Sequence, residues 1–566
     1  MPITGEEIIF SNATVFDGHA FLPPGTCVRV RGGTITAVGP AREVAPGAGG
    51  CGSAGLAGVS LVDLRGGTLL PGFIDAHVHP VYAGGQLRRC DLRDGATAAD
   101  YLAIIDRYAR AHPDLEWITG GGWSMDAFPG GLPRREPLDA VTGGRPAFFP
   151  NRDGHGAWVN TAALRRAGID ARTADPADGR IERDAGGEPT GALQEGAASL
   201  VSRLLPETTD EDMDAALAAA QDYLLSLGIT GWQDAIIGSD PGERDNMPAY
   251  LRAAQAGRLL ANVVGALWWE RDRGLDQLPD LRQRRAAGQA GRFRATSVKM
   301  MLDGVAETHT AAMLEPYLDA DGCATEHTGL DFIDPAELPR FVAALDREGF
   351  QVHFHALGDR AVRNALDAIE AARTANGDSG LRHHLAHIQV VHPDDIPRFA
   401  ALSATANMQA LWAAHEPQMD VLTIPFLGER RAGWQYPFRS LQAAGAPLAA
   451  GSDWSVSSPN PLWAAHVAVN RVAPPGAGAF PAGSAPGTSD PFLPGQALDL
   501  PSFLAAYTSG SARINGLADV TGSVRPGLDA DFAVVDADLS HLPAAEIGTA
   551  AVTATWVRGQ IAFQAA

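Results

Sequence analysis

The sequence lacks the features that mark an exported or membrane-spanning protein. It has only four cysteines, which are scattered and form no Cys-x-x-Cys pair, so neither a disulfide framework nor a zinc knuckle is expected. No apolar run reaches the ~20 residues that a membrane-spanning helix needs. The first seven residues have neither the basic start nor the apolar stretch of a signal peptide. These absences predict a cytoplasmic protein with reduced thiols.

An excess of positive charge is also absent. The chain has 44 Lys and Arg against 66 Asp and Glu, a net charge of -22. Nucleic acids and anionic membranes bind basic surfaces, so neither is expected as a partner. A small-molecule substrate is expected instead, and a homodimer stays open. At 566 residues, the chain can hold a large domain and a smaller one.

Short strand patterns gather at both ends of the chain. They are rich in β-forming residues and separated by Gly and Pro turns. We predict one small β-sandwich domain built from both termini. Its parts are residues 1–72 and, after a last barrel helix, the end of segment 505–566. The strand-like runs are 8–16, 27–31, 34–38, 531–536 and 551–557.

The middle of the chain alternates apolar strand-like runs with helical patterns such as 210–227 and 335–348. This alternation is typical of an α/β fold, and eight such strands predict a TIM-like (β/α)8 barrel over residues 73–504. The eight runs are 73–79, 229–234, 262–268, 297–302, 351–355, 384–389, 405–409 and 447–453.

One connection of this barrel is far too long. About 150 residues separate the first and second strands, although a βα connection usually takes only a few. Two further strand-like runs, 117–123 and 146–150, fall in this gap. We predict that residues 86–205 are a large insertion lying over the barrel mouth. The Pro- and Gly-rich stretch 472–498 is predicted to be a long mouth loop.

Metal-binding residue types occupy the C-terminal ends of the predicted strands, where barrel enzymes keep their chemistry. Strand geometry lets His77 and His79 leave the first strand on one face. Several imidazoles with one carboxylate suit a divalent ion, zinc first. A lysine in an apolar strand is costly unless it is paired or modified. Carbamylation of Lys299 would make it an anionic ligand able to bridge two ions. The six candidates are His77, His79, Lys299, His355, His387 and Asp453.

At this point the chain resembles the amidohydrolase superfamily of metal-dependent hydrolases, and most of all its branch with the N-substituted formamide deformylases. The resemblance implies that His77 and His79 hold the more buried ion, and that His355 and His387 hold a second one. It implies a carbamylated Lys299 and a metal-binding, proton-shuttling Asp453. One ion or two is left open. The matching motifs are 71–79, 154–160, 187–195, 298–304, 355–359, 386–389, 451–454 and 522–531.

Several histidines compete with these ligands. His353 lies two residues before His355 and shares its face, but His355 opens the motif 355–359 and is preferred. His383 and His384 are interpreted as structural or substrate-facing. His155, in the insertion, is interpreted as a catalytic, substrate-facing histidine that stabilises the oxyanion, with a loop histidine as the alternative.

Other residues are ambiguous from sequence. Trp123 and Trp454 are placed in the substrate pocket, with the core as an equal alternative, and Trp412 shares this ambiguity. Asp303 is a substrate-binding or supporting residue, or it caps a turn. Two acidic residues complete the set: Asp359 is expected to begin a helix and orient His355, and Glu195 is a site residue or a helix terminus.

The reaction expected is hydrolysis of a non-peptide C–N bond, a linear amide or an N-acyl or N-formyl amine. Metal-activated water would attack, with Asp453 as proton shuttle. Cyclic amides, carbamates and esters or lactones stay open on the same site. A mononuclear deaminase is disfavoured because Gly358 stands where its glutamate would follow His355. A non-enzymatic binding protein is disfavoured because all six ligands are present.

Overall fold

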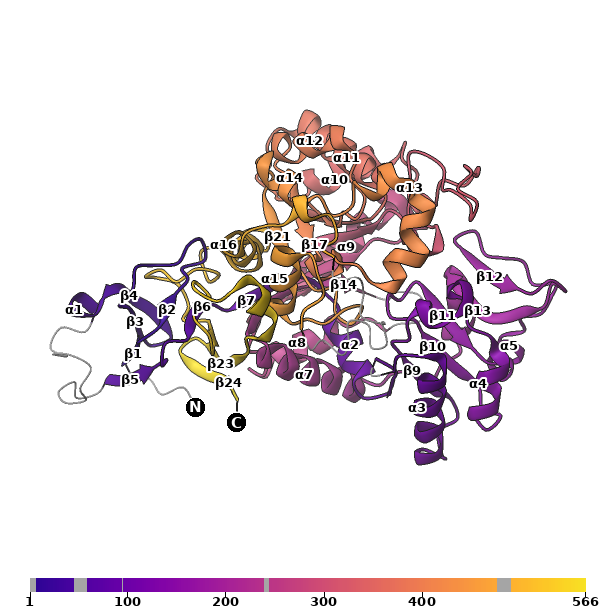
Figure 1. The fold of residues 1–566 in the computed structure, drawn as a ribbon, viewed down its shortest axis with the longest axis horizontal. Coiled ribbons are helices and arrows are strands. Elements are labelled where there is room, and N and C mark those ends of the chain that lie inside the picture. The colour runs from indigo at the N-terminus through magenta and orange to yellow at the C-terminus, as the bar shows by residue number, and fades with distance from the viewer. Residues whose placement is uncertain (1–6, 45–58, 94, 239–243, 476–489, 566) are drawn as a thin grey trace.

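The structure is a computed structural model that describes residues 7–44, 59–93, 95–238, 244–475 and 490–565. Three parts lie in a row (Figure 1): strands from both termini, a central α/β barrel, and a smaller α/β part formed by the insertion. The barrel is therefore flanked on opposite sides by segments that come from its own ends and from its first connection.

The barrel sheet has the eight parallel strands predicted from the sequence, in the order β21-β20-β19-β18-β17-β15-β14-β7. This confirms the predicted fold. The largest difference is at the fourth strand, which begins at Phe293 rather than at 297 and pairs there with the short strand β16 (Gln289–Ala290). The strands are β7 (Phe73–Val78), β14 (Ile229–Ile237), β15 (Asn262–Trp268), β17 (Phe293–Met301), β18 (Gln351–Ala356), β19 (His384–His387), β20 (Thr405–Met408) and β21 (Leu448–Ala450).

The first and last strands meet through backbone hydrogen bonds just beyond their ends. The N–H of Asp453 donates to the carbonyl of His77 at 2.7 Å, and the N–H of His79 donates to the carbonyl of Trp454 at 2.9 Å. Gly451 makes this approach achievable, because a Cβ there would lie 2.5 Å from the nitrogen of His77. A side chain at this position would push the two strands apart.

Helices cover the outside of the barrel. The predicted helix 210–227 is α7 (Asp210–Ser226), and Thr209 begins it with a capping box to Asp212. The apolar residues of these helices pack against the outward side chains of the strands in one continuous core. The other main helices are α8 (Met247–Gln255), α9 (Leu278–Ala287), α10 (Leu338–Arg347), α11 (Asp359–Asn376), α12 (Ile396–Ala401), α14 (Phe438–Ala443) and α15 (Pro461–Asn470).

The insertion folds around a sheet of its own. Six strands pair in the order β12-β13-β11-β10-β9-β8, so the two extra strand-like runs are not part of the barrel. Helices α3 (Ala98–Ala111), α4 (Arg135–Val141) and α5 (Thr161–Ala167) complete it. The strands are β8 (Cys90–Asp91), β9 (Ile118–Gly121), β10 (Ala147–Pro150), β11 (Gly156–Val159), β12 (Gly179–Arg183) and β13 (Pro189–Glu195).

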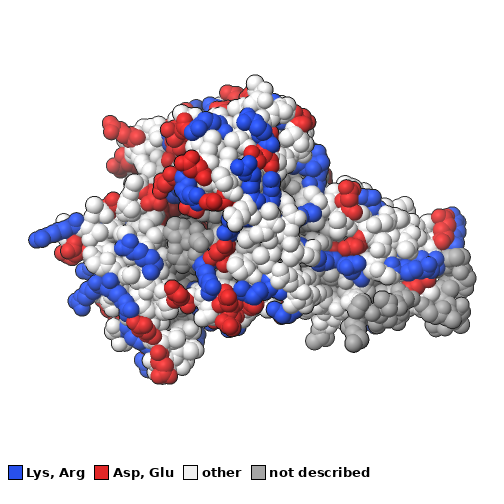
Figure 2. Space-filling model, turned by 180° about the vertical axis from the view of Figure 1, so that it is seen from behind, with Lys and Arg blue, Asp and Glu red and all other residues white. Residues whose placement is uncertain are grey.

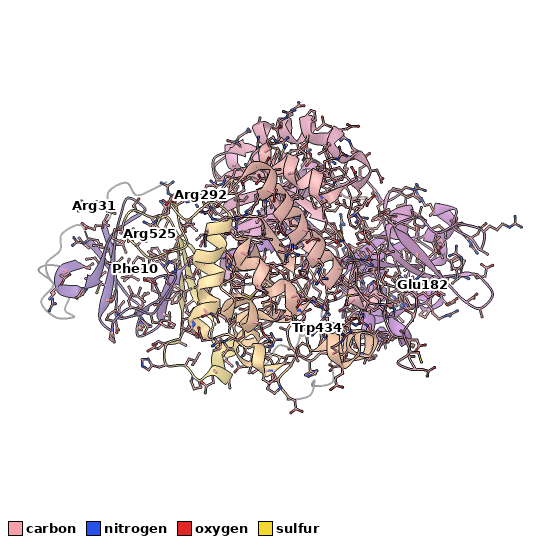
Figure 3. The ribbon with its side chains drawn as sticks, turned by 90° about the horizontal axis from the view of Figure 1, so that it is seen from above. Phe10, Arg31, Glu182, Arg292, Trp434 and Arg525 are labelled. Atoms are coloured by element: carbon pink, nitrogen blue, oxygen red, sulfur yellow. The ribbon has the colours of Figure 1, made fainter. Side chains whose placement is uncertain are left out.

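The terminal strands form two sheets that share one apolar core. Phe10 packs edge-on against Phe532 at 5.3 Å and against Trp556 at 5.0 Å between ring centroids, inside this part of the molecule (Figure 3). The first sheet has β4 (Thr34–Pro40), β3 (Thr26–Arg31), β1 (Glu7–Ser11) and β5 (Val59–Asp63) in that order. The second has β2 (Thr14–Val15), β6 (Thr68–Pro71), β22 (Phe532–Val535), β23 (Val552–Val557) and β24 (Gln560–Gln564).

Two further expectations meet the structure only in part. Most of the predicted mouth loop lies outside the described residues, which resume at Asp490 before α16 (Leu500–Ala505). Among the described residues, no helix is long and apolar enough to cross a membrane. On the face in Figure 2, basic and acidic side chains are interspersed rather than gathered by sign.

Candidate metal centre

Three of the predicted ligands converge at the C-terminal end of the barrel. One ligand atom each of His77, His387 and Asp453 lies within 4.8 Å of the others, and all three residues are buried. Oδ1 of Asp453 is 3.2 Å from Nε2 of His77 and 3.0 Å from Nε2 of His79. Four residues from three strand ends thus surround one point.

The other two predicted ligands line the same space. The rings of His77 and His355 each lie 4.6 Å from the ring of His387. Lys299 is 2% exposed, and its positive charge contributes to the lowered pKa of all three of these histidines. All six residues predicted as ligands therefore lie around the mouth of the barrel.

Asp75 ties the first and last strands together beneath this point. Its Oδ1 accepts the backbone N–H groups of His77 at 3.1 Å and Ser452 at 3.0 Å. Its Oδ2 accepts the hydroxyl of Tyr507 at 3.0 Å. One buried carboxylate thereby fixes the backbone on which His77 and Asp453 stand.

Two of the residues predicted as ligands have left-handed backbone conformations. His387 has a φ of 75° and Asp453 a φ of 55°. Such a φ costs a non-glycine residue about 1–3 kcal/mol and is found most often at functional sites. The surrounding bonds hold both side chains inward despite this cost.

The charge states of these side chains suit a cation. Burial is the main cause that lowers the pKa of His77 and of His387 well below the usual value, so both imidazoles are neutral. Burial acts to raise the pKa of Asp453, but the imidazole of His79 and nearby positive charge outweigh it, so its carboxylate is ionised. Neutral imidazoles offer lone pairs and the carboxylate offers charge.

Unsatisfied atoms support the same interpretation. Nδ1 of His387 and Oδ1 of Asp453 are buried, and neither makes a hydrogen bond of regular geometry with any described residue. Buried polar atoms are normally paired, and exceptions mark functional sites or bound ions. The residues present therefore fit a divalent ion at this point.

His155 reaches the same site from the insertion. Its ring lies 5.5 Å from the ring of His355, and its Nδ1 is 3.0 Å from a carboxylate oxygen of Glu195. Burial acts to lower the pKa of His155, but the charge of Glu195 outweighs it and raises the pKa to about 9. Glu195 also accepts the hydroxyl of Thr310 at 2.8 Å, which joins the insertion to the loop after β17.

Asp303 differs from its predicted place in the substrate pocket. It is fully buried, and its carboxylate accepts the backbone N–H groups of Ala312, Leu357 and Gly358. Burial raises its pKa to about 7. Asp303 therefore shapes the loops behind His355, whose Nε2 lies 3.9 Å from it.

Asp359 begins α11 as predicted, but the expectation that it orients His355 is not met. Its carboxylate accepts the backbone N–H of Leu314 at 2.8 Å instead. His355 points its Nε2 at the carbonyl of Gly304 at 3.4 Å instead.

Two tryptophans predicted for the substrate pocket lie in cores. Trp123 is 2% exposed, packs against Phe128 and Trp158, and donates its indole N–H to the carbonyl of Phe149. Trp454 is 1% exposed. Trp412 is the aromatic residue that meets the site, because its ring stacks on His387 at 5.2 Å with an interplanar angle of 2°.

Other polar residues lie next to the residues predicted as ligands. His353, set aside as a ligand, lies 2.7 Å from His77 through its Nε2. His384 packs against His353 with ring centroids 4.1 Å apart, whereas His383 is structural and pairs with Asp346 at 3.1 Å. Asn407 was not singled out at all, and only its place at the end of a predicted strand could have marked it.

This fold and this cluster define a metal-dependent hydrolase built on a barrel. A family model described as the amidohydrolase family matches residues 60–563, so the chain belongs to the amidohydrolase family. It is accordingly a hydrolase that acts on carbon–nitrogen bonds.

Several known proteins align with almost all of this chain. Protein LONG AFTER FAR-RED 3 of Arabidopsis thaliana is 30% identical over 98% of this chain and 91% of that protein. N-substituted formamide deformylase of Arthrobacter pascens is 28% identical over 99% of this chain and 98% of that protein. The solved structure of an uncharacterized metal-dependent hydrolase from Pyrococcus horikoshii OT3 aligns with a TM-score of 0.70 at 23% identity, over 95% of this chain and 99% of that chain.

Proposed function

We propose that this protein hydrolyses the C–N bond of a small linear amide, an N-acyl or N-formyl amine, with the help of zinc. The observation that carries the proposal is the contact of the ionised Asp453 carboxylate with two imidazoles, at 3.2 Å from His77 and 3.0 Å from His79. A carboxylate held among neutral histidines can both bind a cation and exchange protons.

His77, His79 and Asp453 would hold one ion, and His387 and His355 a second. A divalent ion here supplies Lewis acidity, which polarises a carbonyl and lowers the pKa of water to near 7. Because His77, His387 and Asp453 are buried, electrostatic effects among them are stronger than in water. The insertion, through His155, limits the space above the ligands.

Lys299 is proposed to carry a carbamate. A plain ammonium has only donors and would repel nearby positive charge, yet Lys299 lies among residues that offer a cation site. Burial is the main cause that lowers the pKa of His353 on β18 and of His384 on β19, and the positive charge of Lys299 adds to it. A carbamate would replace this positive charge by an anionic oxygen donor suited to two ions.

Asp453 moves the proton. Its ionised carboxylate accepts a proton from the attacking water and then passes it to the leaving nitrogen, so that the amine departs neutral. One carboxylate thereby acts as general base and then as general acid. Its backbone, fixed by the hydrogen bond to the carbonyl of His77, keeps the side chain over the reacting atoms.

His155 stabilises the negative charge that develops on the carbonyl oxygen. With a pKa of about 9, its imidazole is protonated at neutral pH and Nε2 is available as a charged donor, because Nδ1 faces Glu195. Charged donors aimed at a developing oxyanion contribute about 3–4 kcal/mol to transition-state stabilisation.

The experiment is a hydrolysis screen on the purified protein paired with metal analysis. We expect amine release from N-formyl or N-acetyl amines, at least one zinc ion per chain, and loss of activity with a chelator that zinc reverses. Similarity to a protein named for N-substituted formamides supports starting with N-formyl amines. Hydrolysis of lactones, esters or cyclic amides alone, or deamination alone, would overturn the proposed substrate class.

A further inference from the structure

A second histidine stands directly behind His77 inside the barrel. Nδ1 of His77 lies 2.7 Å from Nε2 of His353, and both side chains are buried. Two ring nitrogens this close form a hydrogen bond, so one proton lies between them. If Nε2 of His77 is to bind an ion, that proton sits on Nδ1 of His77 and His353 is the acceptor.

A directed chain of hydrogen bonds runs beside this pair. The side-chain atom of Asn407 that faces the carbonyl of Ala76 at 3.0 Å must be its nitrogen, because a carbonyl can only accept. The same nitrogen lies 3.2 Å from Nδ1 of His384, which is therefore an acceptor. The Asn407 oxygen accepts from Gln409 at 3.3 Å.

These hydrogen bonds reach the backbone next to His77 and that of His387. Asn407 binds the backbone just before His77, and the oxygen of Gln409 accepts the backbone N–H of His387 at 2.6 Å. The ring of His384 packs on that of His353 at 4.1 Å. The remaining nitrogens, Nδ1 of His353 and Nε2 of His384, have no hydrogen-bond partner among the described residues. Each ring is thus oriented through one nitrogen only.

We propose that His353 and Asn407 are positioning residues, which fix the tautomer and the orientation of His77 from inside the barrel so that its Nε2 faces the ion. The inference rests on the metal site of the proposed function. His353 acts as the acceptor for His77, and Asn407 holds His384 against His353 while bonding the strand that carries His77. Neither residue touches the substrate or the ion.

The test measures zinc affinity and the visible spectrum of the cobalt-substituted protein. His353→Phe keeps a ring of similar size but removes the acceptor, whereas His353→Gln places an amide oxygen near the position of Nε2. We expect His353→Phe to weaken zinc binding roughly 10- to 100-fold, as loss of a partner of a ligand histidine does, and to change the cobalt absorption bands. His353→Gln should restore most of the affinity and the wild-type bands.

Asn407→Leu should weaken zinc binding in the same range, and the double variant His353→Phe/Asn407→Leu should lose less than the product of the two single effects, because both act through one network. Ser297→Ala is the matched control. Ser297 is a buried polar residue of the neighbouring strand that bonds Gln233 and Gln351, and its loss should leave zinc affinity within twofold of wild type.

The outcomes separate this inference from the proposed function. Thermal unfolding of each metal-free variant is measured first, so that a folding defect is not read as a binding defect. If the wild-type protein binds no zinc, the proposed metal site is wrong and so is this inference. Wild-type zinc binding and amide hydrolysis with unchanged affinity in His353→Phe would overturn the inference alone. Failure of His353→Gln to restore binding, with loss of a full ion, would make His353 a ligand and also overturn it.

Discussion

Glu195 contacts His155 through both its backbone and its side chain. The backbone N–H of Glu195 donates to the carbonyl of His155 at 2.8 Å, and its carboxylate lies 3.0 Å from Nδ1 of the same imidazole. Glu195 itself has a φ of 50°, so a strained residue is kept where its charge faces His155. Since the pair sits over the metal ligands, its charge state should control the reaction.

Replacing Glu195 by Gln should shift the alkaline limb of the pH–rate profile. His155 has a pKa of about 9 because of Glu195, so the wild-type rate should fall only as the pH rises through about 9. Without the carboxylate, burial acts to lower the pKa of His155 and only the charges of Asp153 and Asp453 oppose it, so the limb should move to lower pH. Turnover at pH 8 should drop by roughly 10²- to 10³-fold, as expected for loss of an oxyanion donor.

Glu188→Gln, an exposed site in the same insertion, is the control and should keep the wild-type profile. The same linkage affects stability. The raised pKa of His155 contributes stability that is complete below pH 6.5 and is lost as the pH rises through about 9. An unchanged alkaline limb in Glu195→Gln, at wild-type zinc content, would show that His155 is not the charged donor.

Asp453→Asn should abolish most turnover while keeping the size of the side chain. Asn cannot accept the water proton, and loss of a positioned general base costs on the order of 10²-fold or more in kcat. The assay is amine release at saturating zinc, so that weaker metal binding is not the cause. Asp519→Asn changes a fully exposed aspartate and serves as control. Near-normal amide hydrolysis by Asp453→Asn would exclude the shuttle role.

Lys299→Ala should remove metal and activity together if Lys299 is a carbamate. The anionic oxygen donor is lost with the side chain, and a short carboxylic acid could supply an oxygen donor in its place. Added acetate or propionate should therefore restore part of the activity. The intact protein grown with ¹³C bicarbonate should give a carbamate carbon signal by NMR. If Lys299 is an unmodified ammonium and the protein binds one zinc ion, the site is mononuclear and the carbamate proposal is wrong.

The sequence predicted the barrel because its pattern is local. Each strand shows a buried apolar run, and His77, His387 and Asp453 mark strand ends that a closed barrel brings to one rim. The alternation of residues along a strand, however, predicts which face of the sheet a side chain occupies. It does not predict how deep inside the barrel that side chain lies. His353 and His355 share a face of β18, and only the three-dimensional register puts His353 behind His77 and His355 beside His387.

Aromatic and acidic residues could not be assigned in the same way. Trp123 in a core and Trp412 beside His387 look alike in sequence, since both follow strand-like runs. Glu195 was a candidate through its motif, but its partner His155 lies just before β11, and the β11–β13 register brings the two together. Contacts between distant segments, unlike periodicity, leave no local pattern.

Removal of metal should destabilise the fold. The ligands come from strands far apart in the chain and converge only in the native state, so an ion that binds there stabilises it by about 2.7 kcal/mol at a concentration 100 times its Kd. Thermal unfolding with and without a chelator should show a lower Tm for the metal-free protein, and zinc should restore it. The control variant is His541→Ala, because His541 is exposed and lies far along the chain from the predicted ligands. Zinc should raise its Tm by the same amount as that of the wild type. A Tm that does not respond to zinc would contradict this.

Anomalous diffraction at the zinc edge from crystals of the zinc-loaded protein will show whether His77, His387 and Asp453 bind a divalent ion. We predict an anomalous peak with an imidazole nitrogen of His77 and an oxygen of Asp453 about 2.0–2.2 Å away. We also predict His387 as a ligand of this ion or of a second one beside it. Zinc bound elsewhere, with Asp453 and His77 left without an ion at full zinc occupancy, would contradict this prediction.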